Sequence, residues 1–136
     1  MRFIEPRRRA PRISIDGLCG LATDHDLRHA SMVELSAIGL RIELPFDAAA
    51  ASRSVQLELE LPGTDEILWV RGQVTSARLS PMGGCHPDGQ PRLWCRAGIH
   101  IDAAAWRDRR LLRDYVIETR RAQSGRADRP TLDSLS

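Results

Sequence analysis

The sequence predicts an all-β domain, either an antiparallel barrel or a sandwich, that ends in a single α-helix. The strands are predicted by an alternation of apolar and polar residues, clearest in 55–61, where one valine and three leucines alternate with Gln56, Glu58 and Glu60. Strand-like and helix-like segments do not alternate along the chain, which argues against a parallel sheet. The helix is predicted by one segment near the end, 103–121, that contains neither glycine nor proline.

The strand-like runs are separated by stretches rich in turn-forming residues. The first run, 13–21, is weak, and the second, 33–35, is short. The run at 67–79 is long and continuous, and Gly72 within it is expected to mark a bulge or a close approach of another strand. We expect an exposed connection at 23–28, a hairpin turn at 61–65 and a long loop at 80–92, rich in proline and glycine. The predicted strands are 13–21, 33–35, 40–44, 55–61, 67–79 and 93–101.

The last element differs from the rest in its periodicity. Asp102 is a suitable N-cap for a helix that runs from Ala103 to about Arg121. Residues at helical spacing form one stripe that should pack on the strands, while several arginines face water. The following residues, 122–136, are polar and without pattern, which predicts a disordered tail. The packing stripe consists of Leu111, Leu112, Tyr115, Val116 and Thr119.

Length and composition are those of one ordinary soluble domain. The 136 residues are 42% hydrophobic and 28% charged, and no apolar run approaches the roughly 20 residues that cross a bilayer. No apolar segment follows the arginine-rich start, so we expect no secretory signal and a cytoplasmic location. The number of cysteines is odd, and none of the three, Cys19, Cys85 and Cys95, has the spacing of a metal site, so we expect free thiols. A zinc site at Cys85, His86 and Cys95 would lack a fourth ligand, so we expect no metal.

All 20 basic side chains other than histidine are arginine, and the chain has no lysine. This excludes mechanisms that need a lysine, such as a P-loop or a Schiff base. A guanidinium is a planar fork that suits phosphates and the edge of guanine. Serine-hydrolase, zinc-protease and paired-carboxylate motifs are also missing from the sequence, so we do not expect an enzyme.

Four arginines crowd into the short segment before the first strand: Arg7, Arg8, Arg9 and Arg12. Pro11 disfavours a helix there, and the segment has no apolar residues at regular spacing to bury. We therefore expect 1–12 to be a flexible cationic arm that can close over an anion. A solvated basic arm without a ligand is the simpler alternative.

The arm contains the spacing RxxxR, at Arg8 and Arg12, and a second motif follows at the end of the second strand. There Glu34, Ser36 and Gly39 form an acidic-x-Ser-x-x-Gly turn. In this order, with a final strand containing Ala97-Gly98-Ile99 and then a helix, the sequence from about Arg7 to Tyr115 resembles the PilZ domain family of bacteria.

The resemblance implies an antiparallel β-barrel of about six strands with its terminal helix, over residues 13–121. It also implies a receptor for cyclic di-GMP that signals to an unidentified downstream protein and needs no other cofactor. The implied ligand-binding residues are the arm arginines Arg7, Arg8 and Arg12, which take guanine edges and phosphates, together with Glu34, Ser36 and Gly39. Val33 and Leu35 should point inward, leaving Glu34 outward.

Glu34 is where this chain departs from the family, which usually has Asp or Asn. A glutamate can still accept hydrogen bonds from guanine N–H groups, but its extra methylene moves the carboxylate and predicts weaker or altered binding. The alternative is a degenerate PilZ-like domain that binds no cyclic di-GMP and acts as an adaptor. Ser36 and Gly39 should build a tight turn in either case.

A barrel that binds single-stranded nucleic acid is a third hypothesis, which the sequence disfavours. Such a protein needs aromatic residues interleaved with its basic ones, and only Phe3 lies near the arginine cluster. The tryptophans Trp69, Trp94 and Trp106 are expected to be packing residues, and His100 is expected on the solvent face of a strand.

Overall fold

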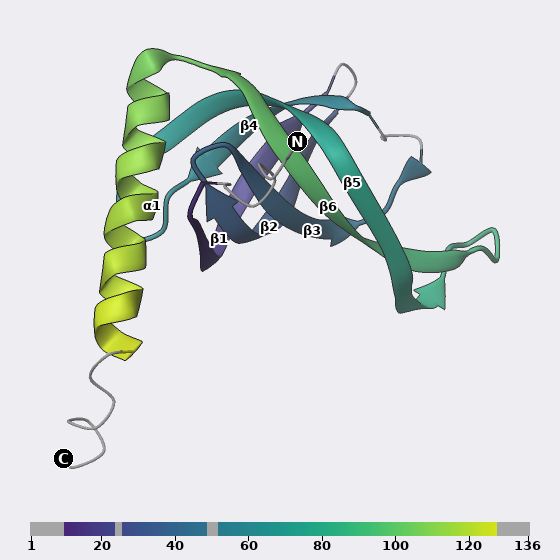
Figure 1. Cartoon of the computed structure of the whole chain (residues 1–136). Coiled ribbons are helices and arrows are strands. Elements are labelled where there is room, and N and C mark those ends of the chain that lie inside the picture. The colour runs from purple at the N-terminus through teal and green to yellow at the C-terminus, as the bar shows by residue number, and fades with distance from the viewer. Residues whose placement is uncertain (1–9, 24–25, 49–51, 128–136) are drawn as a thin grey trace, which may run out of the picture.

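The computed structural model describes residues 10–23, 26–48 and 52–127, and these form six strands and one helix. All neighbouring strands are antiparallel, in the order β1-β2-β3-β6-β5-β4, and β4 returns to β1 so that the sheet closes into a barrel (Figure 1). The predicted fold class is confirmed, and the barrel is selected over the sandwich. The elements are β1 (Arg12–Ala22), β2 (Leu27–Ser36), β3 (Gly39–Pro45), β4 (Ser54–Glu60), β5 (Ile67–Cys85), β6 (Pro91–Ala104) and α1 (Trp106–Ala127).

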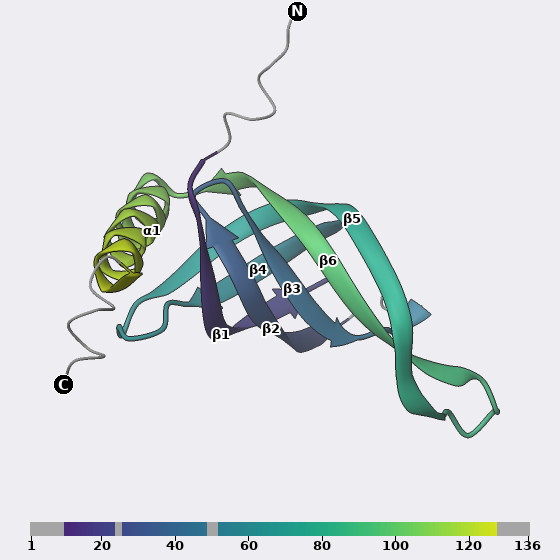
Figure 2. The ribbon, with the colours of Figure 1, turned by 60° about the horizontal axis from the view of Figure 1, so that its bottom comes forward.

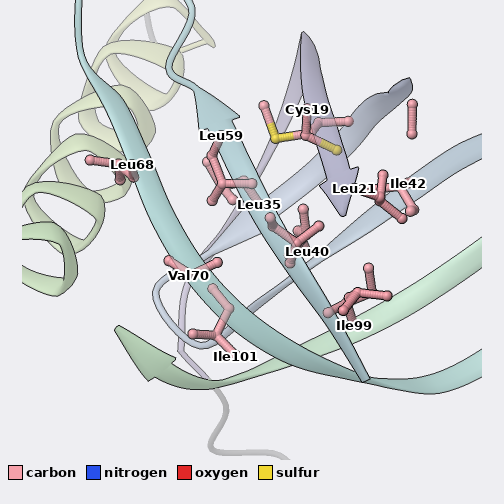
Figure 3. Close-up of a cluster of buried hydrophobic side chains, with 14 of the residues drawn as sticks. Cys19, Leu21, Leu35, Leu40, Ile42, Leu59, Leu68, Val70, Ile99 and Ile101 are labelled. Atoms are coloured by element: carbon pink, nitrogen blue, oxygen red, sulfur yellow. The ribbon is translucent and has the colours of Figure 1, made fainter. Parts of the chain in front are cut away.

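The core is built from those apolar members of the alternating runs that point to the inside of the barrel (Figure 3). Leu57 and Leu59 are 0% exposed, and Ile42 and Ile99 are nearly as deeply buried. Successive side chains of a strand point to opposite faces of the sheet, so the same alternation that fills the core places the polar residues outside. Gly72 marks a bulge where β5 lies against β6, as predicted.

Helix α1 packs against the barrel through the predicted stripe, in contact with β1, β2 and β5. Leu112 and Val116 are each 1% exposed. The hydroxyl of Tyr115 donates a hydrogen bond of 2.7 Å to the carbonyl oxygen of Pro62, in the β4–β5 turn. These contacts hold the helix against the β4–β5 end of the molecule.

Both ends of α1 differ from the prediction. Asp102 is not an N-cap: β6 continues through it, and its carboxylate accepts hydrogen bonds from Arg71 and Gln73 on β5. The acidic residue of the first helical turn is instead Asp108, whose Oδ2 accepts from the backbone N–H of Trp69 at 3.2 Å. A carboxylate is stabilised there by the positive end of the helix.

At its other end the helix continues to Ala127, so the predicted tail is wrong for residues 122–127. The polar side chains there offered no apolar stripe from which a helix could be predicted. The turn is held by backbone hydrogen bonds of the helix and by Gln123, whose amide donates to the carbonyl oxygen of Ser14 on β1 at 3.2 Å. Residues 128–136 lie outside the described part of the chain, as do residues 1–9 with Arg7 and Arg8.

The predicted loop at 80–92 is instead the end of a long hairpin. β5 pairs with β4 only as far as Gln73, but its pairing with β6 continues to Cys85, opposite Pro91. This hairpin projects from the barrel on the side away from α1 (Figures 1 and 2). Its residues 80–92 are all exposed, so no pattern of burial marks them as strands. They are strands because their backbones pair with each other.

The second strand is longer than predicted and shifted by a bulge. β2 begins at Leu27, which shortens the expected connection at 23–28. Its pairing with β3 slips between Met32 and Glu34, so Met32 is fully buried and Val33 only half-buried, which corrects the inward position expected for Val33. Leu35 points inward as predicted.

Two of the three tryptophans are not packing residues. Trp69 is 58% and Trp106 is 72% exposed, which corrects the prediction, whereas Trp94 is half-buried. Trp69 lies on the outer face of β5 between the buried Leu68 and Val70, so the alternation of this strand directs it to solvent. Trp106 begins α1 outside the packed stripe.

The cysteines are free thiols, of which Cys19 and Cys95 are buried and Cys85 is exposed. Burial raises the pKa of the Cys19 thiol to about 12, so this side chain is an uncharged core residue at neutral pH. In the described part of the chain, no helix is long and apolar enough to cross a membrane. The same residues contain no group of three or more side chains placed to hold a metal ion.

Replacing a fully buried core residue should destabilise the barrel. Leu57→Ala leaves a cavity among the inward side chains and is expected to lower the free energy of unfolding by about 2–5 kcal/mol. Leu27→Ala is the matched control, because Leu27 is 61% exposed, and should change it by less than about 0.5 kcal/mol. Urea unfolding of the two variants measures both values, and equal losses would contradict the described core.

Candidate functional site

The turn between β2 and β3 is organised by the hydroxyl of Ser36. Its Oγ accepts hydrogen bonds from the backbone N–H groups of Ile38, at 3.2 Å, and Gly39, at 3.1 Å. It also lies 3.2 Å from the carbonyl oxygen of Gly39, to which the hydroxyl donates. The carbonyl of Ile38 accepts from Ile101 N–H on β6 at 2.8 Å, which ties the turn to the neighbouring strand. Ser36 and Gly39 therefore build a tight turn, as expected.

Gly39 is required by the close approach of β3 to β6. A Cβ atom at this position would lie 2.5 Å from the carbonyl oxygen of Ile99 and 3.6 Å from the Cα of His100. Backbone atoms cannot move away as the end of a flexible side chain can. The motif glycine thus lets the turn lie flat against β6.

Three charged side chains lie beside this turn on the outer faces of β1, β2 and β3. Oε1 of Glu34 is 3.3 Å from NH1 of Arg12 and 4.0 Å from NH1 of Arg41. Both arginine side chains are 45% exposed and Glu34 is 32% exposed, so the ion pairs are held loosely in solvent. One carboxylate is shared by two guanidiniums, and the cluster carries a net positive charge.

The turn and the charged cluster line one open hollow of about 310 Å³. Its far wall is formed by β5 and β6, where the pairing has a bulge between Val74 and Ser76. Bulges re-aim side chains and are frequent beside functional sites. The hollow is lined by Ala10, Arg12, Glu34, Leu35, Ser36, Ile38, Gly39, Leu40, Arg41, Thr75, Ser76, Gly98, Ile99 and His100.

Gly98 lies beside the far wall, where the hydroxyl of Ser76 takes the space that a side chain on Gly98 would need. A Cβ atom on Gly98 would lie 2.7 Å from the Oγ of Ser76. The hydroxyl of Thr75 donates to the carbonyl oxygen of Gly98 at 3.2 Å. Small and hydroxyl-bearing residues therefore face the cationic cluster across the hollow.

The structure brings together four of the six residues predicted as ligand-binding: Arg12, Glu34, Ser36 and Gly39. The other two, Arg7 and Arg8, precede the described residues. Arg12 belongs to β1 rather than to the arm that precedes it. Glu34 points outward, as predicted, into the hollow.

The sequence interpretation missed the part of the site that comes from β3, β5 and β6. Arg41 could have been found, because Leu40 and Ile42 alternate with it as inward residues and it follows the motif glycine by two positions. His100 is exposed, as predicted, but its place in the hollow was not. Thr75 and Ser76 carry no sequence pattern that links them to a motif 40 residues earlier, so only the strand pairing reveals them.

A comparison with protein-family models matches residues 6–118 to the PilZ domain. The chain belongs to the PilZ family. A search of curated proteins found no match.

Solved structures agree with this PilZ assignment in their fold. The PilZ domain of YcgR from Escherichia coli, solved with c-di-GMP, has a TM-score of 0.65 at 18% identity, over 90% of this chain and 98% of that one. MotI/DgrA of Bacillus subtilis, an inhibitor of motility, has a TM-score of 0.62 at 17% identity, over 84% of this chain and 51% of that one. PlzA of Borreliella burgdorferi, in complex with c-di-GMP, has a TM-score of 0.59 at 8% identity, over 89% of this chain and 54% of that one. The chain thus spans about half the length of the latter two.

Gly39→Ala should destabilise the site turn, because the new Cβ meets the Ile99 carbonyl at 2.5 Å. We expect the strands to separate locally, at a cost of about 1–3 kcal/mol in the free energy of unfolding. Gly125→Ala is the matched control: this helical glycine has nothing within 4 Å of an added Cβ. That change should stabilise by about 0.5–1 kcal/mol. Urea unfolding measures both, and an unchanged stability of Gly39→Ala would contradict the close approach.

Proposed function

We propose that this domain is a bacterial, cytoplasmic receptor for cyclic di-GMP, which binds in the hollow beside the Ser36–Gly39 turn. The observation that carries the proposal is the meeting of Arg12 with Glu34 and that turn. These residues come from two motifs separated by more than twenty positions in the chain. The proposed role is that of a binding module and not of an enzyme.

The charges of the site suit a dianion. Cyclic di-GMP carries two phosphates, and the hollow is lined by Arg12 and Arg41 with Glu34 as the one carboxylate among the lining residues described. Arg7 and Arg8 lie five and four positions before Arg12, so an extended chain carries them at most roughly 14–18 Å from it. In the proposal they close over the ligand and add to this positive charge.

The hydrogen-bonding groups suit guanine. A guanidinium can donate two hydrogen bonds to the O6 and N7 acceptors of guanine, worth about 1–3 kcal/mol of discrimination. The carboxylate of Glu34 can accept from guanine N–H groups once phosphates take over its arginine partners. Ser36 and Gly39 supply the turn against which the base docks.

The comparisons support the ligand through two relatives whose structures contain it, the PilZ domain of YcgR and the PlzA protein. In the proposal, the closure of the arm changes the surface around the hollow, and a downstream protein recognises that change.

One observation favours a second candidate, a degenerate PilZ domain that acts as an adaptor without the nucleotide. Glu34 already pairs with both Arg12 and Arg41, so a ligand must displace an internal counter-ion. If breaking these ion pairs costs more free energy than the contacts of the arginines with the phosphates supply, the unaltered protein does not bind cyclic di-GMP. Glu34→Asp, whose shorter side chain reaches the arginines less well, then creates binding.

Calorimetric titration with cyclic di-GMP tests the proposal directly, with GTP and a single-stranded oligonucleotide as control ligands. We expect the unaltered protein to bind cyclic di-GMP selectively, and Arg12→Gln to weaken this at least about tenfold, which is about 1.4 kcal/mol. Affinity should fall as salt rises, because exposed charges are screened. Arg113→Gln is the matched control, an exposed helical arginine paired with Asp114 away from the hollow. Equal affinity of Arg12→Gln and the control would remove Arg12 from the site.

Glu34 is tested by comparing its variants with the unaltered protein. Glu34→Ala should weaken the binding of cyclic di-GMP by about 1–3 kcal/mol, because guanine donors lose their partner in the contact. Glu34→Asp should maintain or strengthen binding, and neither change should alter the melting temperature by more than a few degrees, since the side chain lies outside the core. Equal affinity for all three proteins would show that Glu34 does not contact the base.

A further inference from the structure

Arg41 lies in the hollow but belongs to neither motif. We propose that Arg41 binds a phosphate of the nucleotide and is a further cationic ligand of the site, beside Arg12. This inference rests on the proposed function and adds to it the residue that receives the phosphate on the far side of the hollow.

The direction of Arg41 follows from the strand that carries it. Its neighbours Leu40 and Ile42 are 6% and 1% exposed and point into the barrel, so Arg41 must point outward. In the strand pairing it lies opposite Glu34 on β2 and opposite Gly98 on β6. It therefore stands at the middle of the hollow, between the motif residues and the far wall.

On its β6 side, Arg41 faces a polar part of the hollow. Gly98 presents only backbone, and beyond it lie the hydroxyl groups of Ser76 and Thr75. Thr75 already donates to Gly98, whereas the Ser76 hydroxyl makes no hydrogen bond within the described part of the chain. A phosphate in the hollow between Arg41 and Ser76 would meet a guanidinium on one side and a free hydroxyl donor on the other.

The guanidinium of Arg41 is also little used by the protein. Among the described residues its one ion pair is with Glu34, at 4.0 Å, compared with 3.3 Å for the pair of Arg12 with the same oxygen. Its side chain makes no hydrogen bond to any described residue. A guanidinium has five N–H donors and forms its strongest contacts as a fork on a phosphate or carboxylate. Arg41 therefore has donors available that Glu34 does not occupy.

The first experiment is a calorimetric titration of Arg41→Gln with cyclic di-GMP. We expect the affinity to fall about tenfold or more and the dependence on salt to become shallower, because one charged contact is lost. Arg71→Gln is the matched control: Arg71 is also an exposed strand arginine, paired with Asp102 at 3.3 Å outside the hollow, and should bind within about twofold of the unaltered protein. Arg41→Lys, which keeps the charge but not the fork, should fall between Arg41→Gln and the unaltered protein.

A double-mutant cycle with Glu34→Gln separates a direct contact from an indirect effect. If Arg41 binds the phosphate, Arg41→Gln still weakens binding at least severalfold when Glu34 is already replaced. If Arg41 only neutralises Glu34, the loss disappears in that background, and the inference is overturned. Circular dichroism of each variant confirms that the barrel is folded.

The failure of this inference can be distinguished from failure of the proposed function. Binding of cyclic di-GMP that is lost in Arg12→Gln but unchanged in Arg41→Gln would overturn the role of Arg41 alone. No binding by the unaltered protein at any salt concentration would overturn both.

Discussion

The close contact between β3 and β6 at Gly39 is the constraint on which the site depends. Because the carbonyl of Ile99 leaves no room for a side chain there, the turn made by Ser36 lies directly on β6. This contact carries Arg41 over Gly98 and joins the motif residues of β1 and β2 to the hydroxyl groups of β5. The hollow is thus a property of the closed barrel and not of a single loop.

Glu34 gives this site its particular electrostatic character. Its carboxylate is the shared partner of Arg12 and Arg41, whose side chains are both 45% exposed. Such exposed ion pairs contribute little to stability, so their main effect is on orientation. Under the proposed function, the phosphates of a bound dianion would pair with Arg12 and Arg41 in place of Glu34 and leave its carboxylate free to accept hydrogen bonds from a base. Glu34 would then compete with the ligand for the two arginines and also contact it.

The errors of the sequence interpretation share one physical origin. Period-two alternation reports burial, and it correctly predicted the strands around Leu57, Ile42 and Ile99, which fill the core. Residues 80–92 of the hairpin are all exposed, so the strands there gave no pattern, and the last helical turn around Gln123 is likewise polar. In both places the structure is formed by backbone hydrogen bonds, between strands or within the helix, and the side chains show no pattern that predicts it.

The sequence by itself determined the all-β class, the terminal helix with Leu112 and Val116 inward, and the two motifs that identify the family. Alternation and motif spacing are local properties of the sequence, so they can be recognised without knowing which strands pair. Only the tertiary structure decided that Arg41, Ser76 and Gly98 share one hollow with those motifs. The physical reason is that strand register is set by the barrel as a whole, with bulges at Val33 and Thr75 that shift which side chains meet.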